Sequence, residues 1–401
     1  MLPIKVDSRF RRILNFIGII AWTLALFAYF FQFPYAWLSS WILPFFFVFL
    51  ATQFVNIRLP KSKPLRILLM CYALYLCVEA IRSVVLGVAL GRIIRFLAIL
   101  LLIPMCCMIR PKAFQRHLRI LSFLATGKAV LLIAIAFNLL LVGNHDAIRA
   151  WVTTHNRGDI YLLHGLPYVQ VHGNALLMVS FMVDCMHNRK LTKQGALILA
   201  GILCAGNFAF ILGLAGFGCY LLWLYLVPKI KAGKIDLRKL MITAGICAIP
   251  AAAFFIYKVI EKSAVSNAVR ISQIGILLDT NLLWGSGLGS IIEATTKFIT
   301  YSGDIYFELQ TLYIINQIGF VGIGLYFFIS LHAVSKRSKS TLIVYLLYLL
   351  YSFWNPYCFD ATQLISCFAI LNMLPQGGND DQSSYYYLLP GYFRGEKRIN
   401  H

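Results

Sequence analysis

The run QGALILAGILCAGNFAFILGLAGFGCYLLWLYLV, from Gln194 to Val227, contains no charged residue. A helix needs about 20 apolar residues to cross a hydrocarbon core ~30 Å thick, and this run is about twice that length. We therefore expect two transmembrane helices here, joined by a tight turn near Gly213 to Gly216. The many small residues in the run favour close contact between membrane helices.

The composition of the whole chain supports a membrane protein. Hydrophobic residues make up 60% and charged residues 13% of the sequence, and the mean hydropathy is +0.76. These values are outside the range of soluble domains. The apolar runs are too continuous for a transmembrane barrel, whose strands alternate polar and apolar residues. We expect an all-α, polytopic integral membrane protein that forms a single membrane domain over residues 1–401.

Basic residues predict the orientation of the chain. The net charge of +21 would suggest nucleic acid in a soluble protein. Here, however, many of the lysines and arginines lie in short clusters between apolar runs, which by the positive-inside rule belong in the cytoplasm. An even number of crossings then separates neighbouring clusters, which gives about 12 helices with both termini cytoplasmic. The clusters lie at 5–12, 58–66, 110–119, 189–193, 229–239, 336–339 and 394–398. The expected helices are 13–31, 36–55, 67–81, 93–109, 120–142, 172–188, two within 194–227, 240–257, 311–333, 341–353 and 363–375.

Some charged residues fall inside or beside these helices. Glu79, Arg82, Arg92 and Arg95 lie near the outer end of the second helical hairpin. They either snorkel to the interface or pair locally, or they line a polar cavity, and the sequence does not decide between these roles. Lys128 lies within an apolar run, where a charge is costly enough to require a partner or a water-filled cavity. Its depth favours a structural role.

Two long polar segments interrupt the apolar pattern on the predicted outer side, at 143–171 and 259–310, and a polar tail follows at 376–401. Both long loops carry arginines on the side that the positive-inside rule leaves poor in them: Arg149 and Arg157 in the first, Arg270 in the second. A guanidinium at the membrane surface presents a planar fork of donors suited to a diphosphate on a lipid. The alternative is an arginine that contacts only solvent or lipid headgroups.

Glu308 precedes the apolar run of residues 309–329, so a rigid helix would hold this carboxylate at the membrane boundary. That placement suits a general base or a group that orients an acceptor hydroxyl. Asp304 and Tyr306 are second candidates. The glycines of 285–289 do not complete a dinucleotide-binding motif and follow no βαβ strand, so they either bring backbone amides to a ligand or turn the loop. The outer histidines lack the spacing of metal ligands, and we expect no metal or cofactor.

Several of these residues together resemble a known superfamily. They are Arg270, the run Asn281-Leu282-Leu283-Trp284-Gly285-Ser286-Gly287-Leu288-Gly289, Glu308-Leu309-Gln310 leading into Gly319-Phe320-Val321-Gly322, and Arg157 followed by His172-Gly173-Asn174. The pattern resembles the O-antigen polymerases and ligases, the Wzy and WaaL proteins. Ligases carry a histidine where this chain has Glu308, which favours the polymerase. The Ser-Arg pair common in the family is absent, since Leu212-Gly213-Leu214-Ala215 occupies that region. The paired arginine pattern of some polymerases is not reproduced either.

The resemblance implies a GT-C-like fold in a bacterial inner membrane. It also implies metal-independent glycosyl transfer at the periplasmic face, from an undecaprenyl-diphosphate-linked oligosaccharide, in lipopolysaccharide biosynthesis. Glu308 and Arg270 would be catalytic, and Arg157, Arg149, Asn174, His172, Tyr306 and Asp304 would bind substrate. Membrane lipid and a chain-length regulator protein are expected partners, and nucleic acid is not. Two alternatives stay open: a ligase that transfers glycan to lipid A-core, and a flippase or other transporter of lipid-linked sugar.

Overall fold

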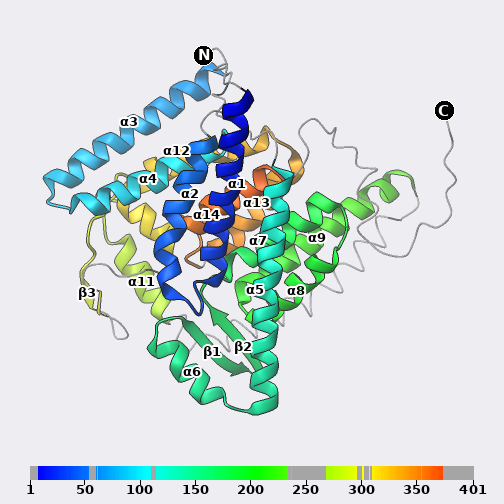
Figure 1. Ribbon diagram of the computed structural model, residues 1–401. Helices are drawn as coiled ribbons and strands as arrows, with labels where there is room; N and C mark the ends of the chain where they lie inside the picture. The colour runs from blue at the N-terminus through cyan, green and yellow to red at the C-terminus, as the bar shows by residue number, and fades with distance from the viewer. Residues whose placement is uncertain are drawn as a thin grey trace, which may run out of the picture. The chain divides into compact units, whose positions relative to one another are not determined.

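The computed structural model describes residues 8–53, 60, 62–109, 114–163, 165–233, 236, 268–295, 300–301, 307, 309–353 and 355–373. These residues are mostly helical (Figure 1). The chain divides into two compact units, which are described separately. The first unit comprises Met1–Ala21, Leu43–Ala113 and Asp236–Leu371. The second unit comprises Trp22–Ile42, Phe114–Ile235 and Asn372–His401.

Within the described ranges, six segments are apolar enough and long enough to cross a membrane, which indicates a membrane protein. They are α1 (Ser8–Phe31), η1 with α2 (Ala36–Leu38 and Ser39–Gln53), α3 (Lys63–Val85), α5 (Gln115–Val142), α9 (Phe208–Lys231) and α12 (Gln310–Ser335). Shorter helices are α4 (Leu90–Cys106), α6 (His145–Thr154), α7 (Ala175–Asn188), α8 (Lys193–Ala205), α11 (Ala268–Leu278), α13 (Lys339–Ser352) and α14 (Ala361–Leu371). The helix expected at 240–257 lies outside the described residues, so the total of about 12 crossings stays a prediction.

In the second unit, α7 packs against α5, α8 and α9, and α5 also packs against α8. Small residues allow the close contact of α5 with α8, because a Cβ on Gly201 would lie 2.5 Å from the Cβ of Ala129. The turn predicted near Gly213 to Gly216 is wrong. The chain turns at Gly206, which has a φ of +59°, and Asn207 then caps α9 by accepting a hydrogen bond from Ala209 N at 2.9 Å. Gly213 is instead buried within α9.

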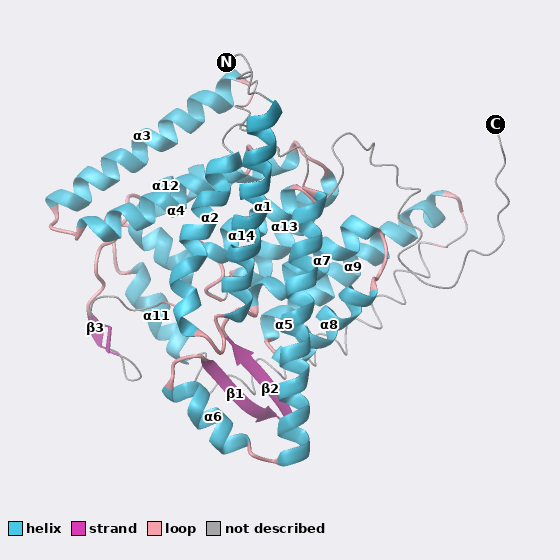
Figure 2. Cartoon of the chain, viewed as in Figure 1, coloured by secondary structure: helices cyan, strands magenta, loops and turns pink. Residues whose placement is uncertain are grey.

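Much of the first long loop has regular structure. After α6, the strands β1 (Gly158–Leu163) and β2 (Leu166–Val171) form an antiparallel hairpin, with register from Gly158↔Val171 to Leu163↔Leu166. β2 packs on α5 and α8, and α6 packs on β1, as Figure 2 shows. The inward residues Val169 and Val171 are buried, so the hairpin has its own apolar face. The expectation of an all-α fold did not include this hairpin or the short pair β3 (Ala294–Thr295) and β4 (Thr300–Tyr301).

In the first unit, α12 contacts α3, α4, α11 and α13, and α14 packs against α4 and α13. Gln363 on α14 donates a hydrogen bond to the Tyr326 hydroxyl on α12 at 2.7 Å. Both side chains are buried, so this bond satisfies polar groups away from water.

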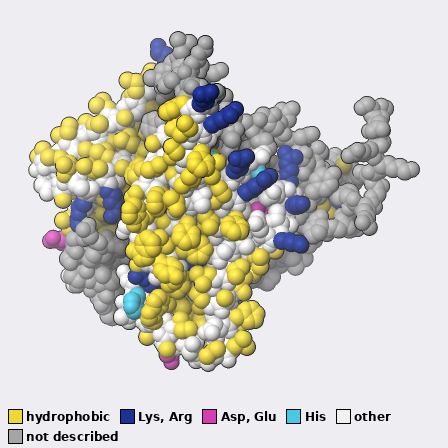
Figure 3. All heavy atoms as spheres, viewed as in Figure 1, with side chains coloured by type: hydrophobic (Ala, Val, Ile, Leu, Met, Phe, Trp, Pro, Cys, Tyr) yellow, Lys and Arg dark blue, Asp and Glu magenta, His cyan; other side chains and the backbone are white. Residues whose placement is uncertain are grey.

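Hydrophobic side chains cover much of the face drawn in Figure 3. On α3, Ile67, Met70, Leu74, Val78 and Ile81 are exposed at helical spacing, which makes one apolar face. Such a face is costly in water but suits contact with lipid chains. The exposed surface therefore agrees with insertion into a membrane.

Candidate functional site

The second polar loop contains a helix, α11, that the sequence did not predict. Arg270 lies in the first turn of α11 and is half-buried. The other end of α11 is anchored by Leu277, which packs with Phe307 and Leu309. Three predicted site residues, Glu308, Asp304 and Tyr306, lie outside the described residues. Their distances from Arg270 are therefore untested.

The glycine-rich segment of residues 281–290 forms hydrogen bonds with α12 at a break in that helix. The helix is interrupted at Gly319, which has a φ of 62° and a ψ of −179°. The N–H groups of Ser286 and Gly287 donate to the carbonyls of Asn316 and Gln317, at 2.6 and 3.0 Å. In return, the N–H groups of Phe320 and Val321 donate to the carbonyls of Leu282 and Leu283, at 2.8 and 3.3 Å. Four bonds to the loop thus replace the bonds that the helix loses at the break.

Only glycine fits at two points of this junction. A Cβ on Gly319 would lie 2.2 Å from the Leu283 carbonyl oxygen, and a Cβ on Gly285 would lie 2.6 Å from that of Gln317. Both residues also have positive φ. Of the two roles left open for these glycines, the structure supports turning and close packing of the loop. The amides of Ser286 and Gly287 serve α12.

Charged residues of α3 hold the same segment. Arg82 Nη1 lies 3.1 Å from Glu79 Oε2, and Arg82 Nη2 donates to the Gly285 carbonyl at 2.8 Å. The Tyr75 hydroxyl donates to the Ile318 carbonyl at 2.7 Å, beside the break. Glu79 and Arg82 therefore pair locally, which was one of the roles considered for them.

The two arginines of the first loop have different surroundings. Arg149 makes a two-pronged ion pair with Asp159, with Nε 2.9 Å from Oδ1 and Nη2 3.2 Å from Oδ2. Both side chains are partly exposed, and the pair joins α6 to β1. Asp159 raises the pKa of the Arg149 guanidinium through this hydrogen bond and its charge. Arg149 therefore has its donors directed at the hairpin, which favours a structural role.

Arg157 is half-buried and forms no ion pair with a carboxylate in the described part of the chain. Its Nε is buried and has no hydrogen-bond acceptor among the residues that the structure describes. The backbone around it is fixed, because its carbonyl accepts a hydrogen bond from the N–H of His172 at 3.0 Å. A buried guanidinium N–H without an acceptor is costly, so a carbonyl, a water or an anion that accepts from it would be stabilising.

His172, Gly173 and Asn174 form the turn that leads into α7. Gly173 has a φ of +87°, and a Cβ there would lie 2.6 Å from the Tyr29 carbonyl oxygen. Asn174 donates its side-chain amide to the Val169 carbonyl at 2.9 Å, while its Oδ1 is buried and has no hydrogen-bond partner in the described ranges. The turn is thus tied to α1 and to β2.

Positive charge gathers at this turn. Partial burial, and then the Arg157 and Lys128 cations, lower the pKa of the His172 imidazole from its usual value. Lys128 on α5 has no exposed surface, and its Nζ donates to the His172 carbonyl at 2.8 Å. The amino end of α7 adds the positive end of a helix dipole. All of these features favour an anion at the His172 turn.

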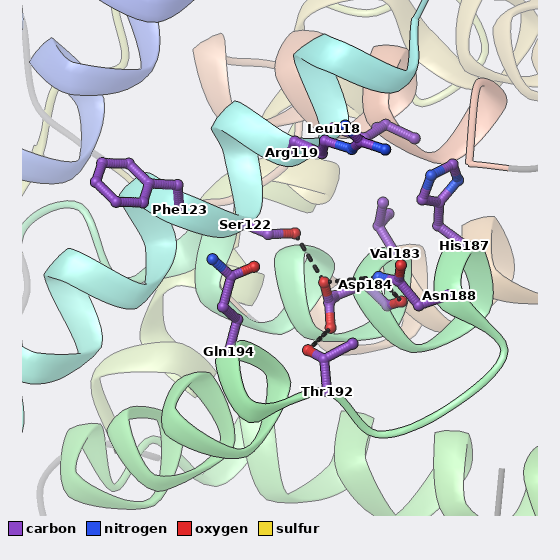
Figure 4. Close-up of a pocket in the computed structure, with 10 residues that line it drawn as sticks. All are labelled: Leu118, Arg119, Ser122, Phe123, Val183, Asp184, His187, Asn188, Thr192 and Gln194. Carbon is purple, nitrogen blue, oxygen red and sulfur yellow. Dashed lines mark hydrogen bonds between the residues drawn. The ribbon is translucent and has the colours of Figure 1, made fainter.

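A hollow of about 410 Å³ lies elsewhere in the second unit and contains none of the predicted site residues. Figure 4 shows its buried Asp184 surrounded by donors. Asp184 accepts hydrogen bonds from Ser122 on α5 at 3.0 Å, from Asn188 on α7 at 3.0 Å and from Thr192 before α8 at 2.5 Å. These bonds fasten three helices together, which gives Asp184 a structural role.

The sequence alone predicts the arginines, His172 and Asn174 as candidate site residues. It does not connect Lys128 with them. The only sign of Lys128 in the sequence is a lysine within an apolar run. Its predicted depth in the membrane suggests a structural role and no other. The hairpin of β1 and β2 brings the His172 turn to Lys128, and no spacing in the sequence reveals this. Comparisons of the chain with protein families, with curated proteins and with solved structures found no match.

Proposed function

We propose that the protein is a polysaccharide polymerase, a glycosyltransferase that joins oligosaccharide repeat units carried on undecaprenyl diphosphate into O-antigen or a related surface polysaccharide. The observation that carries the proposal is the positive charge at the start of α7, for which the described residues supply no carboxylate in an ion pair. There, beside His172, a half-buried Arg157 has a buried Nε without an acceptor in the described part of the chain. A diphosphate supplies the missing acceptors and negative charge.

In the proposed reaction, a hydroxyl of the acceptor sugar attacks the anomeric carbon of the donor sugar. The bond from that carbon to the diphosphate oxygen breaks, and the electron pair leaves with undecaprenyl diphosphate. Arg157 stabilises the negative charge that develops on this leaving group. The sequence resemblance assigns the same task to Arg270, and it assigns acceptance of the hydroxyl proton to Glu308.

The remaining predicted residues have lesser parts. Asn174 and His172 shape the turn that presents the donor site, and Tyr306 and Asp304 are proposed to contact sugar. The pairing of Arg149 with Asp159 leads us to propose a structural role for this arginine. A periplasmic face of the bacterial inner membrane, a GT-C-like arrangement and a chain-length regulator as partner belong to the same proposal.

One observation favours a second candidate, a transporter of lipid-linked sugar. The helix α12 is broken at Gly319, and discontinuous helices commonly form substrate sites in transporters. Here, however, the backbone groups at the break bond to residues 282–287. That arrangement leaves them unavailable to a substrate, so the polymerase is the preferred proposal.

The test uses the full-length protein reconstituted in liposomes with a lipid-diphosphate repeat unit. A polymerase gives a ladder of products on a gel, a ligase instead transfers glycan to added lipid A-core, and a transporter only moves the substrate across the bilayer. Arg157→Ala and Glu308→Gln should each strongly reduce the ladder. Transport that continues in both variants, without polymer from the wild-type protein, contradicts the proposal.

A further inference from the structure

Lys128 lies in the interior of α5 with none of its surface exposed. A lysine inside a membrane helix is costly, and its amine carries three donors that need acceptors or negative charge. Its Nζ makes one hydrogen bond, to the His172 carbonyl at 2.8 Å. In the described part of the chain it forms no salt bridge. A single hydrogen bond to a carbonyl does not offset the desolvation cost of burying a charged amine.

Further positive charge lies near the Lys128 amine, so a negatively charged partner there would be more strongly stabilised. The cations of Arg157 and Lys128 both act on His172. The backbone of His172 links these two residues directly, because its N–H bonds to the Arg157 carbonyl and its carbonyl accepts from Lys128 Nζ. The nearest described carboxylate along the hairpin, Asp159, is engaged by Arg149. Lys128 and Arg157 thus hold one turn from two sides, and neither forms an ion pair with a carboxylate of the described residues.

Aromatic residues indicate that the turn lies close to the membrane surface. The Lys128 amine lies 5.3 Å from the centre of the Phe33 ring, a cation–π contact, and Phe33 in turn meets Trp151 edge-on at 6.2 Å. Trp151 is exposed, as are Tyr35 and Trp37, which follow Phe33 in the chain. Exposed tryptophan and tyrosine are typical of the membrane–water interface. An anion reaching the turn at this level is best supplied as the headgroup of a lipid.

We propose that Lys128 is a positioning residue for a lipid-carried diphosphate. It fixes the His172 carbonyl, and therefore the turn that directs the Arg157 and His172 side chains to the ligand, and its charge adds to the positive potential at the start of α7. This inference rests on the proposed function, since it names a further residue for the same donor site. Lys128 itself is fully buried and acts through His172.

Stability separates this role from a purely structural one. A lysine kept for the fold stabilises it, so its removal destabilises the protein. A lysine that serves the ligand lowers the stability of the protein without ligand. An apolar side chain of similar length should therefore be tolerated there or should raise that stability. Lys128→Met should therefore leave the thermal midpoint unchanged or raised while weakening diphosphate binding about tenfold or more.

The experiment measures binding of a prenyl diphosphate, a prenyl monophosphate and inorganic diphosphate to the full chain in lipid nanodiscs. Lys128→Gln keeps a donor for the His172 carbonyl but removes the charge, so its affinity should lie between wild type and Lys128→Met. Val130→Met, at an exposed position of the same helix, is the matched control and should bind as wild type. Weaker binding of inorganic diphosphate than of prenyl diphosphate supports a lipid as the source; equal binding assigns the site to a soluble anion.

The outcomes distinguish the two proposals. If Arg157→Ala weakens prenyl diphosphate binding and Lys128→Met does not, Lys128 has no part in the donor site and only this inference fails. If neither variant changes binding, the donor site itself is wrong. A fall in thermal stability of Lys128→Met that matches its loss of binding, with Lys128→Gln restoring both, assigns Lys128 to the fold and overturns the inference.

Discussion

The two polar regions of the chain use their polar groups in opposite ways. In the first unit, the backbone of residues 281–290 bonds to α12, and Arg82 serves both Glu79 and the Gly285 carbonyl. In the second unit, the turn at His172 gathers Arg157 and Lys128, and among the described residues no carboxylate pairs with them and the Arg157 Nε has no acceptor. In the first arrangement the backbone groups at the break in α12 are paired with the loop, whereas in the second the Arg157 Nε has no partner among the described residues.

The difference shows how a polar interruption in a membrane sequence can be assigned. Glycines at 285 and 287 look like a ligand loop in the sequence, yet the structure uses them to pack a loop against a broken helix. Arg157 looks like any loop arginine, yet its buried Nε has no hydrogen-bond partner among the described residues. Whether donors and acceptors are already paired is therefore more informative than the residue types alone.

The largest expected effect is on protein stability, at the junction of residues 281–290 with α12. Gly319→Ala should lower the free energy of unfolding by about 3 kcal/mol or more, because Gly319 has a φ of 62° and a Cβ would lie 2.2 Å from the Leu283 oxygen. Thermal unfolding in detergent measures the loss. Gly324→Ala on the same helix, where a Cβ meets nothing within 4 Å, is the control and should be neutral. Equal stability of the two variants would show that the junction tolerates a side chain.

A large effect on activity is expected at Arg157, beside the His172 turn. Arg157→Ala should reduce polymer formation about a hundredfold, since it removes a preorganised charge from the leaving group. Arg149→Ala should change the rate by less than about threefold, because it breaks an exposed ion pair with Asp159. Initial rates with the lipid-diphosphate donor measure both. Equal losses in the two variants would remove the distinction between these arginines.

A smaller effect on stability is expected at Arg82. Arg82→Ala leaves the buried Glu79 carboxylate unpaired and removes a donor from the Gly285 carbonyl, at a cost of about 2 kcal/mol in unfolding free energy. Adding Glu79→Gln removes the unpaired charge and should recover part of that loss. A double variant less stable than Arg82→Ala would refute the pairing as the cause.

The smallest effect is a dependence of donor binding on pH. Partial burial, Arg157 and Lys128 lower the pKa of His172, so its imidazole is neutral at neutral pH in the empty protein. A bound diphosphate favours the protonated form, so binding takes up a proton and the affinity should rise a few-fold as the pH falls from about 8 to about 5.5. Titrations across this range measure the rise. His172→Gln should flatten it, and an unaltered slope in that variant would assign the effect to another group.

Local patterns in the sequence predicted most of the described helices. The runs at 13–31, 120–142 and 311–333 became α1, α5 and α12, because a membrane crossing needs only continuous apolar length. The turn at Gly206 was misplaced, since glycine serves both turns and helix packing and the sequence does not separate the two uses.

The candidate site depends on tertiary contacts and was only partly predictable. Arg157 and His172 lie 15 positions apart and are joined by the register of β1 with β2, while Lys128 reaches them from α5. Neither contact follows from periodicity. The roles of Glu308, Asp304 and Tyr306 stay predictions, since these residues are outside the described part of the chain.

The break in α12 also has a consequence for how the protein is made. The carbonyls of Asn316 and Gln317 bond to residues 286 and 287, which precede them in the chain. If α12 entered the membrane alone, these carbonyls and two amides would face lipid unpaired, at a cost of several kcal/mol each. Since residues 281–290 are synthesised first, they are available when α12 emerges. Docking of this segment and insertion of the helix should therefore be one event during biosynthesis.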